Sequence, residues 1–254
     1  MRFATFCAAA VVLSAQAFES SPSSWVDPDT GHRVVRLTSE PGSASLYFNQ
    51  NWYTPSGKLV YTTADGISVI DLNTRQSKQV VKGPVRLVDA GRKNERVYYT
   101  RDNAAWWTNV GTGETRRIAD LPRRGAISSI NADETLLAGS YIEGDGEDYN
   151  NARPAPEKIS STAVPSRRTL EEPQNKGEMM ERRWAARLPM GLFTLSVDSG
   201  EVKTIHRAND WLGHLLFSPT DPGLLMFCHE GPWHKVDRIW TIRQAQELSR
   251  ARQS

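Results

Sequence analysis

Residues 54–74 read TPSGKLVYTTADGISVIDLNT, and this stretch decides the fold. The Pro, Ser and Gly near its start and the later Asp65-Gly66 pair favour turns. The runs between them, KLVYTT and ISVIDL, are rich in β-branched and aromatic residues, which is typical of strands. The stretch therefore predicts a turn, a strand, a second turn and a second strand.

The same order of turn and strand recurs further along the chain, with turns that begin at residues 54, 89, 131 and 218. The interval between the turns at residues 131 and 218 contains an insertion. The underlying period is therefore about forty residues, as in the four-stranded blades of a β-propeller. A β-sandwich of short strands is the alternative. The later strands that we predict are RVYYT (96–100), AAWWTNV (104–110), TLLAGSYI (135–142), LFTLSV (192–197), LLMFCHE (224–230) and DRIWTI (237–242).

The insertion, residues 143–182, is rich in Pro, Ser and charged residues and buries little apolar surface. We expect it to form a long surface loop or a partly disordered flap, and we find no convincing helical periodicity in the chain. We therefore predict an all-β fold. After residue 243 the chain continues as QAQELSRARQS, which is polar and does not resemble a blade.

The composition is that of an ordinary globular protein, which excludes a wholly disordered, collagen-like or coiled-coil chain. The 254 residues are 39% hydrophobic and 24% charged, with a formal net charge of +2. A nucleic-acid-binding surface usually shows a larger and clustered basic excess, so we expect no nucleic-acid partner. Local Arg and His residues can still bind an acidic ligand.

The first 17 residues have the pattern of a signal peptide. A basic start and a short apolar run are followed by Ala15-Gln16-Ala17, a small-x-small cleavage pattern. We expect residues 1–17 to be removed and the rest, residues 18–254, to be exported. Cys7 leaves with the signal, so Cys228 has no intramolecular disulfide partner. No later apolar run is long enough to span a membrane.

Three of the five histidines lie within one short region, at His214, His229 and His234. His229-Glu230 is followed by Gly-Pro, which breaks the helix that a His-Glu-x-x-His zinc site requires. The chain contains no G-x-S-x-G elbow, Walker loop or G-x-G-x-x-G after a strand. These common catalytic and cofactor sites are therefore excluded.

The region around these histidines also carries a family resemblance. WLGH (211–214), followed by a Ser-Pro turn, and FCHEGP (227–232), followed by VDRIW, resemble strings of the oligogalacturonate lyase family. DPDTGHRVVRLT (27–38) and SLYFNQNWYTPSGKLVYT (45–62) agree with it. The resemblance covers nearly the whole mature chain, most tightly over residues 205–243.

The resemblance implies a seven-bladed β-propeller, of which we expect about four to five blades in this chain, and a chain that is truncated. Members of the family cleave short oligogalacturonides from pectin by β-elimination, using a His base, an assisting Arg and a manganese ion held by three His and a Gln. An imidazole suits the role of base, because its ordinary pKa lies near working pH. Cations such as the assisting Arg and the manganese ion suit this reaction, because negative charge spreads into the uronate carboxylate as the proton leaves.

The resemblance places the base on His214, for which capping a turn is the alternative role. It places the assisting Arg on Gly191. Arg187 is then the nearest substitute and Arg183 lies behind it, although a surface role suits either residue as well. The metal ligands of the family lie beyond VDRIW, so the resemblance assigns no metal ligand in this chain. We expect His229 and His234 to lie beside the cleft and, with Arg183, to contact substrate.

The sequence thus predicts an exported oligogalacturonate lyase, periplasmic or secreted, that acts on an acidic oligosaccharide. The alternative is a non-catalytic propeller module that binds an acidic oligosaccharide or a protein partner. Gly191 and the absent metal ligands motivate this alternative.

Overall fold

The computed structural model describes residues 23–144 and 175–243. The chain divides into two units, Met1–Ser39 and Glu40–Ser254. The predicted signal peptide and the QAQELSRARQS tail lie outside the described residues. The first unit contains a hairpin of β1 (Ser24–Val26) and β2 (Arg33–Val35). In its turn the Asp27 carboxylate accepts a 2.8 Å hydrogen bond from the backbone N–H of Thr30.

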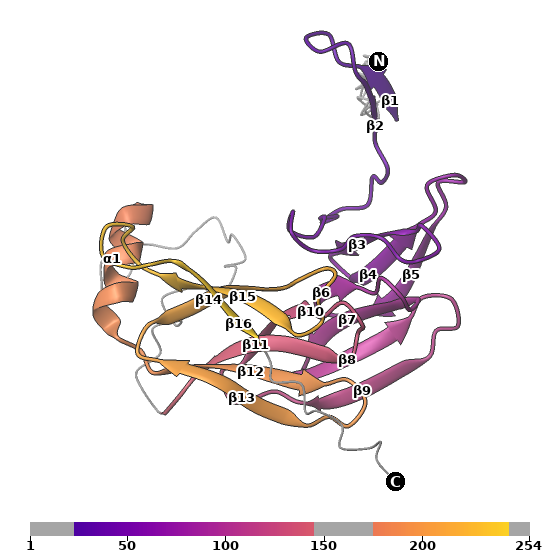
Figure 1. Ribbon diagram of the computed structural model, residues 1–254. Helices are drawn as coiled ribbons and strands as arrows, with labels where there is room; N and C mark the ends of the chain where they lie inside the picture. The colour runs from indigo at the N-terminus through magenta and orange to yellow at the C-terminus, as the bar shows by residue number, and fades with distance from the viewer. Residues whose placement is uncertain (1–22, 145–174, 244–254) are drawn as a thin grey trace, which may run out of the picture. The chain divides into compact units, whose positions relative to one another are not determined.

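The described part of the second unit consists of four antiparallel sheets that follow one another along the chain (Figure 1). Within each sheet every strand pairs with the next strand in sequence, so each sheet is a meander. The first sheet contains β3 (Leu59–Thr63), β4 (Gly66–Ile70) and β5 (Ser77–Lys82). The second contains β6 (Arg86–Ala90), β7 (Arg96–Arg101), β8 (Ala104–Asn109) and β9 (Thr115–Asp120). The third contains β10 (Ala126–Ile130), β11 (Leu136–Ile142), β12 (Met190–Ser196) and β13 (Val202–Ala208), and the fourth contains β14 (Trp211–Phe217), β15 (Leu224–Glu230) and β16 (Ile239–Arg243).

These sheets confirm the repeat that the sequence predicts. The paired runs KLVYTT and ISVIDL form β3 and β4, and each later pair of predicted strands likewise forms neighbouring strands of one sheet. The long segment between β11 and β12 leaves the third sheet continuous, because the two strands pair in register from Leu136–Ser196 to Ile142–Met190. Four successive meanders are the arrangement of propeller blades rather than of a two-sheet sandwich.

The hydrophobic core lies between successive sheets. Tyr98 and Tyr99 are neighbours on β7, and both side chains are fully buried. Tyr98 packs in the cluster shared with the third sheet, whereas Tyr99 packs in the cluster shared with the first sheet. A third cluster joins the third and fourth sheets and includes Leu192 and Leu212. Because neighbouring strand residues point to opposite faces, an interior sheet is buried on both sides, and its strands read as continuous apolar runs.

The first strands of the second, third and fourth sheets lie side by side. β10 contacts both β6 and β14, and the hydroxyl of Ser129 on β10 accepts a 3.0 Å hydrogen bond from the backbone N–H of Phe217 on β14. Each of these strands is also the edge strand of its own sheet. The strand β14, which carries WLGH, therefore belongs to this row of neighbouring first strands.

Helix α1 (Lys176–Ala186) corrects one prediction. Residues 176–182 were expected to be part of a surface loop, but they are helical. The Asn175 side chain caps the helix by accepting a 3.0 Å hydrogen bond from the N–H of Glu178, which also places a negative charge in the first turn. Lys235, in the β15–β16 loop, pairs with Glu181 at 2.7 Å, so the helix packs against that loop (Figure 1). Among the described residues, no helix is long and apolar enough to cross a membrane.

Candidate functional site

His214 projects from an irregular part of β14. The pairing of β14 with β15 shifts register between Gly213 and Leu216, and His214 has a φ of 49°, in the left-handed region. Such bulges re-aim side chains, because the extra residue leaves the regular alternation of the strand. As a result 58% of the His214 side chain is exposed in a strand whose neighbours Leu212 and Leu215 are buried.

The carboxylate of Glu230 lies against this imidazole. Its Oε1 is 3.4 Å from Nε2 of His214, and only 6% of the Glu230 side chain is exposed. Glu230 stands opposite Trp211 in the β14–β15 register, so its side chain lies on the same face as Gly213, two residues along. A Cβ at position 213 would collide with Oε1 of Glu230. The glycine of WLGH therefore makes room for the carboxylate.

Arg183, on α1, binds the other oxygen of the same carboxylate. Its Nη1 donates a hydrogen bond to Oε2 of Glu230, and its guanidinium carbon lies 4.4 Å from the centre of the Trp211 ring. The Arg183 side chain is 23% exposed. One buried carboxylate thus holds the predicted base and one of the two predicted arginines.

Arg187 pairs with a different carboxylate, that of Asp210. It ends α1 in the left-handed conformation and donates a 2.8 Å hydrogen bond to Asp210. The other oxygen of Asp210 is 3.2 Å from Nδ1 of His229. Half of the Arg187 side chain is exposed, at 51%. The structure therefore brings Arg187 to His229 rather than to His214.

His229 and His234 differ in their surroundings. The His229 side chain is 14% exposed and lies 5.3 Å from the Trp240 ring and 6.1 Å from the His206 ring, measured between ring centres. Burial, with the neighbouring His229, lowers the pKa of His206. His234 lies exposed in the turn between β15 and β16. Of the two predicted substrate contacts, His234 is thus the accessible one.

Gly191, where the resemblance calls for an arginine, is covered by an aromatic ring. It pairs with Tyr141 on β11, and a Cβ at position 191 would collide with ring atoms of that tyrosine. On its other side Gly191 pairs with Arg207, whose Nε donates a 2.7 Å hydrogen bond to Glu143. Tyr141 also donates to Glu143, at 2.9 Å. These hydrogen bonds lower the pKa of Glu143.

This cluster of Tyr141, Glu143 and Arg207 was missed by the sequence reasoning. No local motif identifies it, because only the register of three strands brings the residues together. It places an arginine one strand away from position 191.

The side chains of the described residues can be compared with the donors that a manganese ion requires. Across residues 23–144 and 175–243, no three or more His, Cys, Asp or Glu side chains gather as they would around a metal ion. Manganese takes several preorganised oxygen and nitrogen donors. The residues described here therefore do not fit a manganese site.

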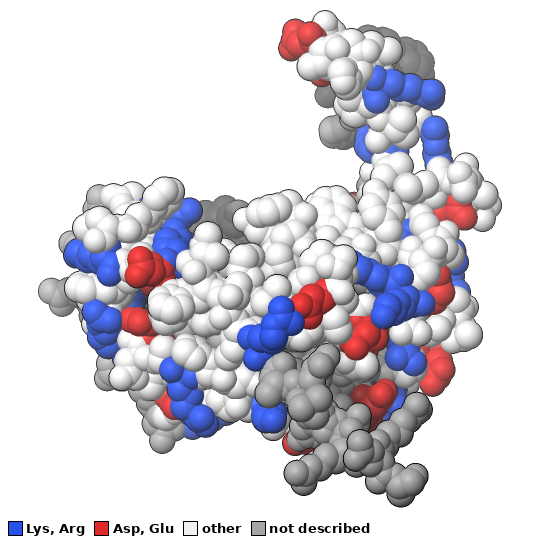
Figure 2. Space-filling view, viewed as in Figure 1, with Lys and Arg blue, Asp and Glu red and all other residues white. Residues whose placement is uncertain are grey.

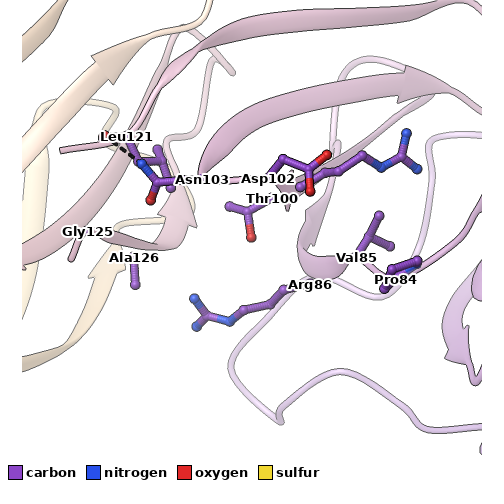
Figure 3. A pocket seen from close by; sticks show the side chains of 10 residues that line it. Pro84, Val85, Arg86, Thr100, Asp102, Asn103, Leu121, Gly125 and Ala126 are labelled. Atoms are coloured by element: carbon purple, nitrogen blue, oxygen red, sulfur yellow. Dashed lines mark hydrogen bonds between the residues drawn. The ribbon is translucent and has the colours of Figure 1, made fainter. Parts of the chain in front are cut away.

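One depression of the surface lies away from the predicted site residues. A depression of about 450 Å³ is lined by the start of β6, the end of β7 and the loop before β10 (Figure 3). Asn103 donates a hydrogen bond of 3.2 Å to the carbonyl of Leu121 at its rim. None of the predicted site residues lines it. On the face seen in Figure 2, acidic and basic residues are interspersed rather than segregated.

Comparisons with known proteins agree on one family. The family model described as oligogalacturonate lyase matches residues 180–253, the region that contains WLGH and FCHEGP. The oligogalacturonate lyase of Dickeya dadantii (strain 3937) is 26% identical over 232 residues, which cover 86% of this chain and 54% of that protein. The oligogalacturonide lyase of Pectobacterium atrosepticum is 43% identical over 54 residues, 21% of this chain and 14% of that protein.

Solved structures share the fold. An oligogalacturonate lyase in complex with manganese has a TM-score of 0.65 and 24% identity, over 87% of this chain and 56% of that one. The oligogalacturonate lyase of Vibrio parahaemolyticus has a TM-score of 0.66 and 23% identity over the same shares. The chain spans about half the length of the Dickeya relative and of these two structures. The structural likeness confirms the predicted propeller-type fold, and the family-model and sequence matches support the oligogalacturonate lyase family for this chain.

Proposed function

We propose that this chain is an oligogalacturonate lyase that cleaves oligogalacturonides by β-elimination and leaves a 4,5-unsaturated uronate end. The observation that carries the proposal is the pairing of an exposed imidazole, His214, with the guanidinium of Arg183 on one carboxylate. β-Elimination next to a carboxylate needs a proton acceptor, the role given to His214, and positive charge, which the two arginines of the α1 end, Arg183 and Arg187, supply. The family matches supply the substrate class.

In the proposed reaction His214 takes the proton from C5 of a galacturonate residue. The electron pair of the C5–H bond forms the C4=C5 double bond, and the C4–O glycosidic bond breaks. The departing oxygen takes up a proton from water, and His214 returns its proton to the solvent, so no net proton is gained or lost. Arg187 is the more exposed arginine and is assigned to the uronate carboxylate, whereas Arg183 supplies positive charge beside His214. His229 and His234 border the substrate.

Manganese has no role in these steps. Among the described residues no side-chain cluster fits the ion, and no step is routed through it. A bound divalent cation would supply further positive charge to a uronate carboxylate.

A direct assay tests the proposal. The full chain is incubated with trigalacturonate, with and without added manganese, and the ultraviolet absorbance of the conjugated double bond is followed. Steady appearance of the unsaturated product is expected, and it should depend on His214. A preparation that is folded by circular dichroism but gives no product under either condition contradicts the proposal.

One observation favours a second candidate, a non-catalytic module that binds an acidic oligosaccharide. The Tyr141 ring occupies the space beside Gly191, so no side chain can extend from that position into a site. Calorimetric titration with trigalacturonate separates the two candidates, because saturable binding without turnover is expected only for the module.

We also propose that the chain is exported, to the periplasm or beyond. The support is the basic, apolar and small-x-small pattern of residues 1–17. Mass spectrometry of the protein from the producing cells should find an N-terminus near Phe18. An intact Met1 in the fraction outside the inner membrane contradicts cleavage.

A further inference from the structure

We propose that Glu230 is a positioning residue, which fixes the orientation and tautomer of His214 and holds Arg183 beside it. The inference rests on the proposed function, since it gives His214 its role. Glu230 itself touches no substrate in this arrangement, because it is buried beneath the imidazole and the guanidinium.

The Glu230 carboxylate is buried and is paired with two groups. A buried carboxylate is costly unless it is paired and hydrogen-bonded. The two oxygens of Glu230 face different groups, with Oε1 3.4 Å from Nε2 of His214 and Oε2 toward Nη1 of Arg183. The carboxylate therefore has the Arg183 guanidinium on one side and the His214 imidazole on the other.

The tautomer follows from this geometry. A carboxylate accepts hydrogen bonds, so it favours the neutral imidazole that carries its hydrogen on Nε2. The lone pair then lies on Nδ1, the other ring nitrogen. A base needs its lone pair directed at the substrate, so Glu230 selects the competent form of an otherwise exposed ring.

Gly213 shows that this approach is built into the strand. Any side chain at position 213 would collide with Oε1 of Glu230, although the backbone of Gly213 is not among the positive-φ glycines. The glycine is therefore required for the close approach of the carboxylate and not for the conformation of the chain.

A purely structural role makes a different prediction. If Glu230 only anchored α1 through Arg183, replacing it would alter stability and leave the His214 ring unchanged. Two variants distinguish the roles. Glu230→Gln removes the charge at constant shape, and Gly213→Ala displaces the carboxylate without changing any ionisable group. Glu181→Gln is the matched control, since Glu181 lies on the same helix and pairs with the surface residue Lys235.

The experiment combines kinetics with nitrogen-15 NMR of the histidine rings in the full chain. In the wild type, neutral His214 is expected to carry its hydrogen on Nε2, and in Glu230→Gln and Gly213→Ala a mixture of tautomers is expected. kcat on trigalacturonate should fall about 10- to 100-fold in both variants, with KM changed by less than about threefold. Glu181→Gln should match the wild type in both readouts.

The outcomes separate this inference from the proposed function. If the wild type turns over substrate and both variants keep its kcat and its His214 tautomer, the role of Glu230 is overturned and the lyase stands. If the wild type makes no product, the proposed function fails, and the tautomer readout alone decides whether Glu230 orients the ring. If Glu230→Gln does not fold, Gly213→Ala carries the test.

Discussion

Tyr141 and Gly191 lie directly opposite one another on β11 and β12, and the tyrosine ring covers the glycine. The hydroxyl of Tyr141 is held by Glu143 at 2.9 Å and lies 3.0 Å from the Thr204 hydroxyl. The ring therefore cannot move aside without breaking these contacts. An aromatic ring packed on a strand glycine also shields the exposed backbone there. The resemblance calls for an arginine at position 191, and in this structure the Tyr141 ring fills the space that a side chain there would need.

Gly191→Ala should lower the free energy of unfolding by about 1–3 kcal/mol, because the new Cβ overlaps the Tyr141 ring. Urea denaturation measures the loss. In a Tyr141→Ala background the same substitution should cost much less, since the space is then free. An equal cost in both backgrounds would show that the ring is not the obstacle.

The two arginines should differ in their contribution to stability. Arg183→Met leaves the buried Glu230 without its cation and should cost about 2–4 kcal/mol. Arg187→Met breaks an ion pair whose arginine is half exposed and should cost less than about 1 kcal/mol. Methionine preserves much of the packing of the aliphatic stem in both cases. Thermal and urea unfolding compare them, and a reversed order would contradict the burial argument.

Asp89, at the end of β6, should make stability depend on pH. Burial, together with the charge of Glu134, raises its pKa to about 7, although Arg92 and the N–H groups of Asn51 and Ala90 act in the opposite direction. Between about pH 4 and pH 7 the unfolded carboxyl is ionised while the folded one still binds a proton. The contribution of Asp89 is therefore fully present below about pH 4 and is lost as the pH rises through 7.

Asp89→Asn removes this dependence while its oxygen can still accept the hydrogen bond from Asn51. The stability of the variant relative to the wild type should rise by about 3–4 kcal/mol between pH 4 and pH 7. Urea titrations at several pH values across that window measure the difference. Parallel curves for the two proteins would mean that Asp89 is ionised in the folded state throughout.

His214→Ala should reduce kcat on trigalacturonate by about 10²- to 10⁴-fold, as removal of a general base does. His32→Ala is the matched control, because His32 is an exposed histidine in the separate N-terminal hairpin unit. The unsaturated product is followed by absorbance. Equal activity of the two variants would remove His214 from the reaction.

The blades could be predicted from the sequence because their signals are local. Runs such as RVYYT alternate between two buried faces, and both Tyr98 and Tyr99 are buried as a continuous apolar run requires. The predicted turns that begin at residues 89, 131 and 218 fall where the first strand of the second, third and fourth sheets ends. Helix α1 was missed because its amphipathic pattern is weak, and its position depends on a cap at Asn175 and on contacts with the β15–β16 loop.

The candidate site was predicted only in part. The motif strings identified His214, and the resemblance indicated Arg183 and Arg187, but neither indicated which carboxylate each group binds. The sequence assigned Glu230 no role in the site, whereas in the structure its carboxylate contacts both His214 and Arg183.

By itself the sequence determined an all-β chain of repeated meanders, its likeness to a lyase family and the histidine at its centre. Only the tertiary structure decided that Glu230 joins His214 to Arg183, that Asp210 joins His229 to Arg187, and that Tyr141 covers Gly191. The physical reason is distance along the chain. Strand and turn preferences act between near neighbours, whereas Arg183 and Glu230 are 47 residues apart and meet only because strand register and packing bring a helix onto the end of β15.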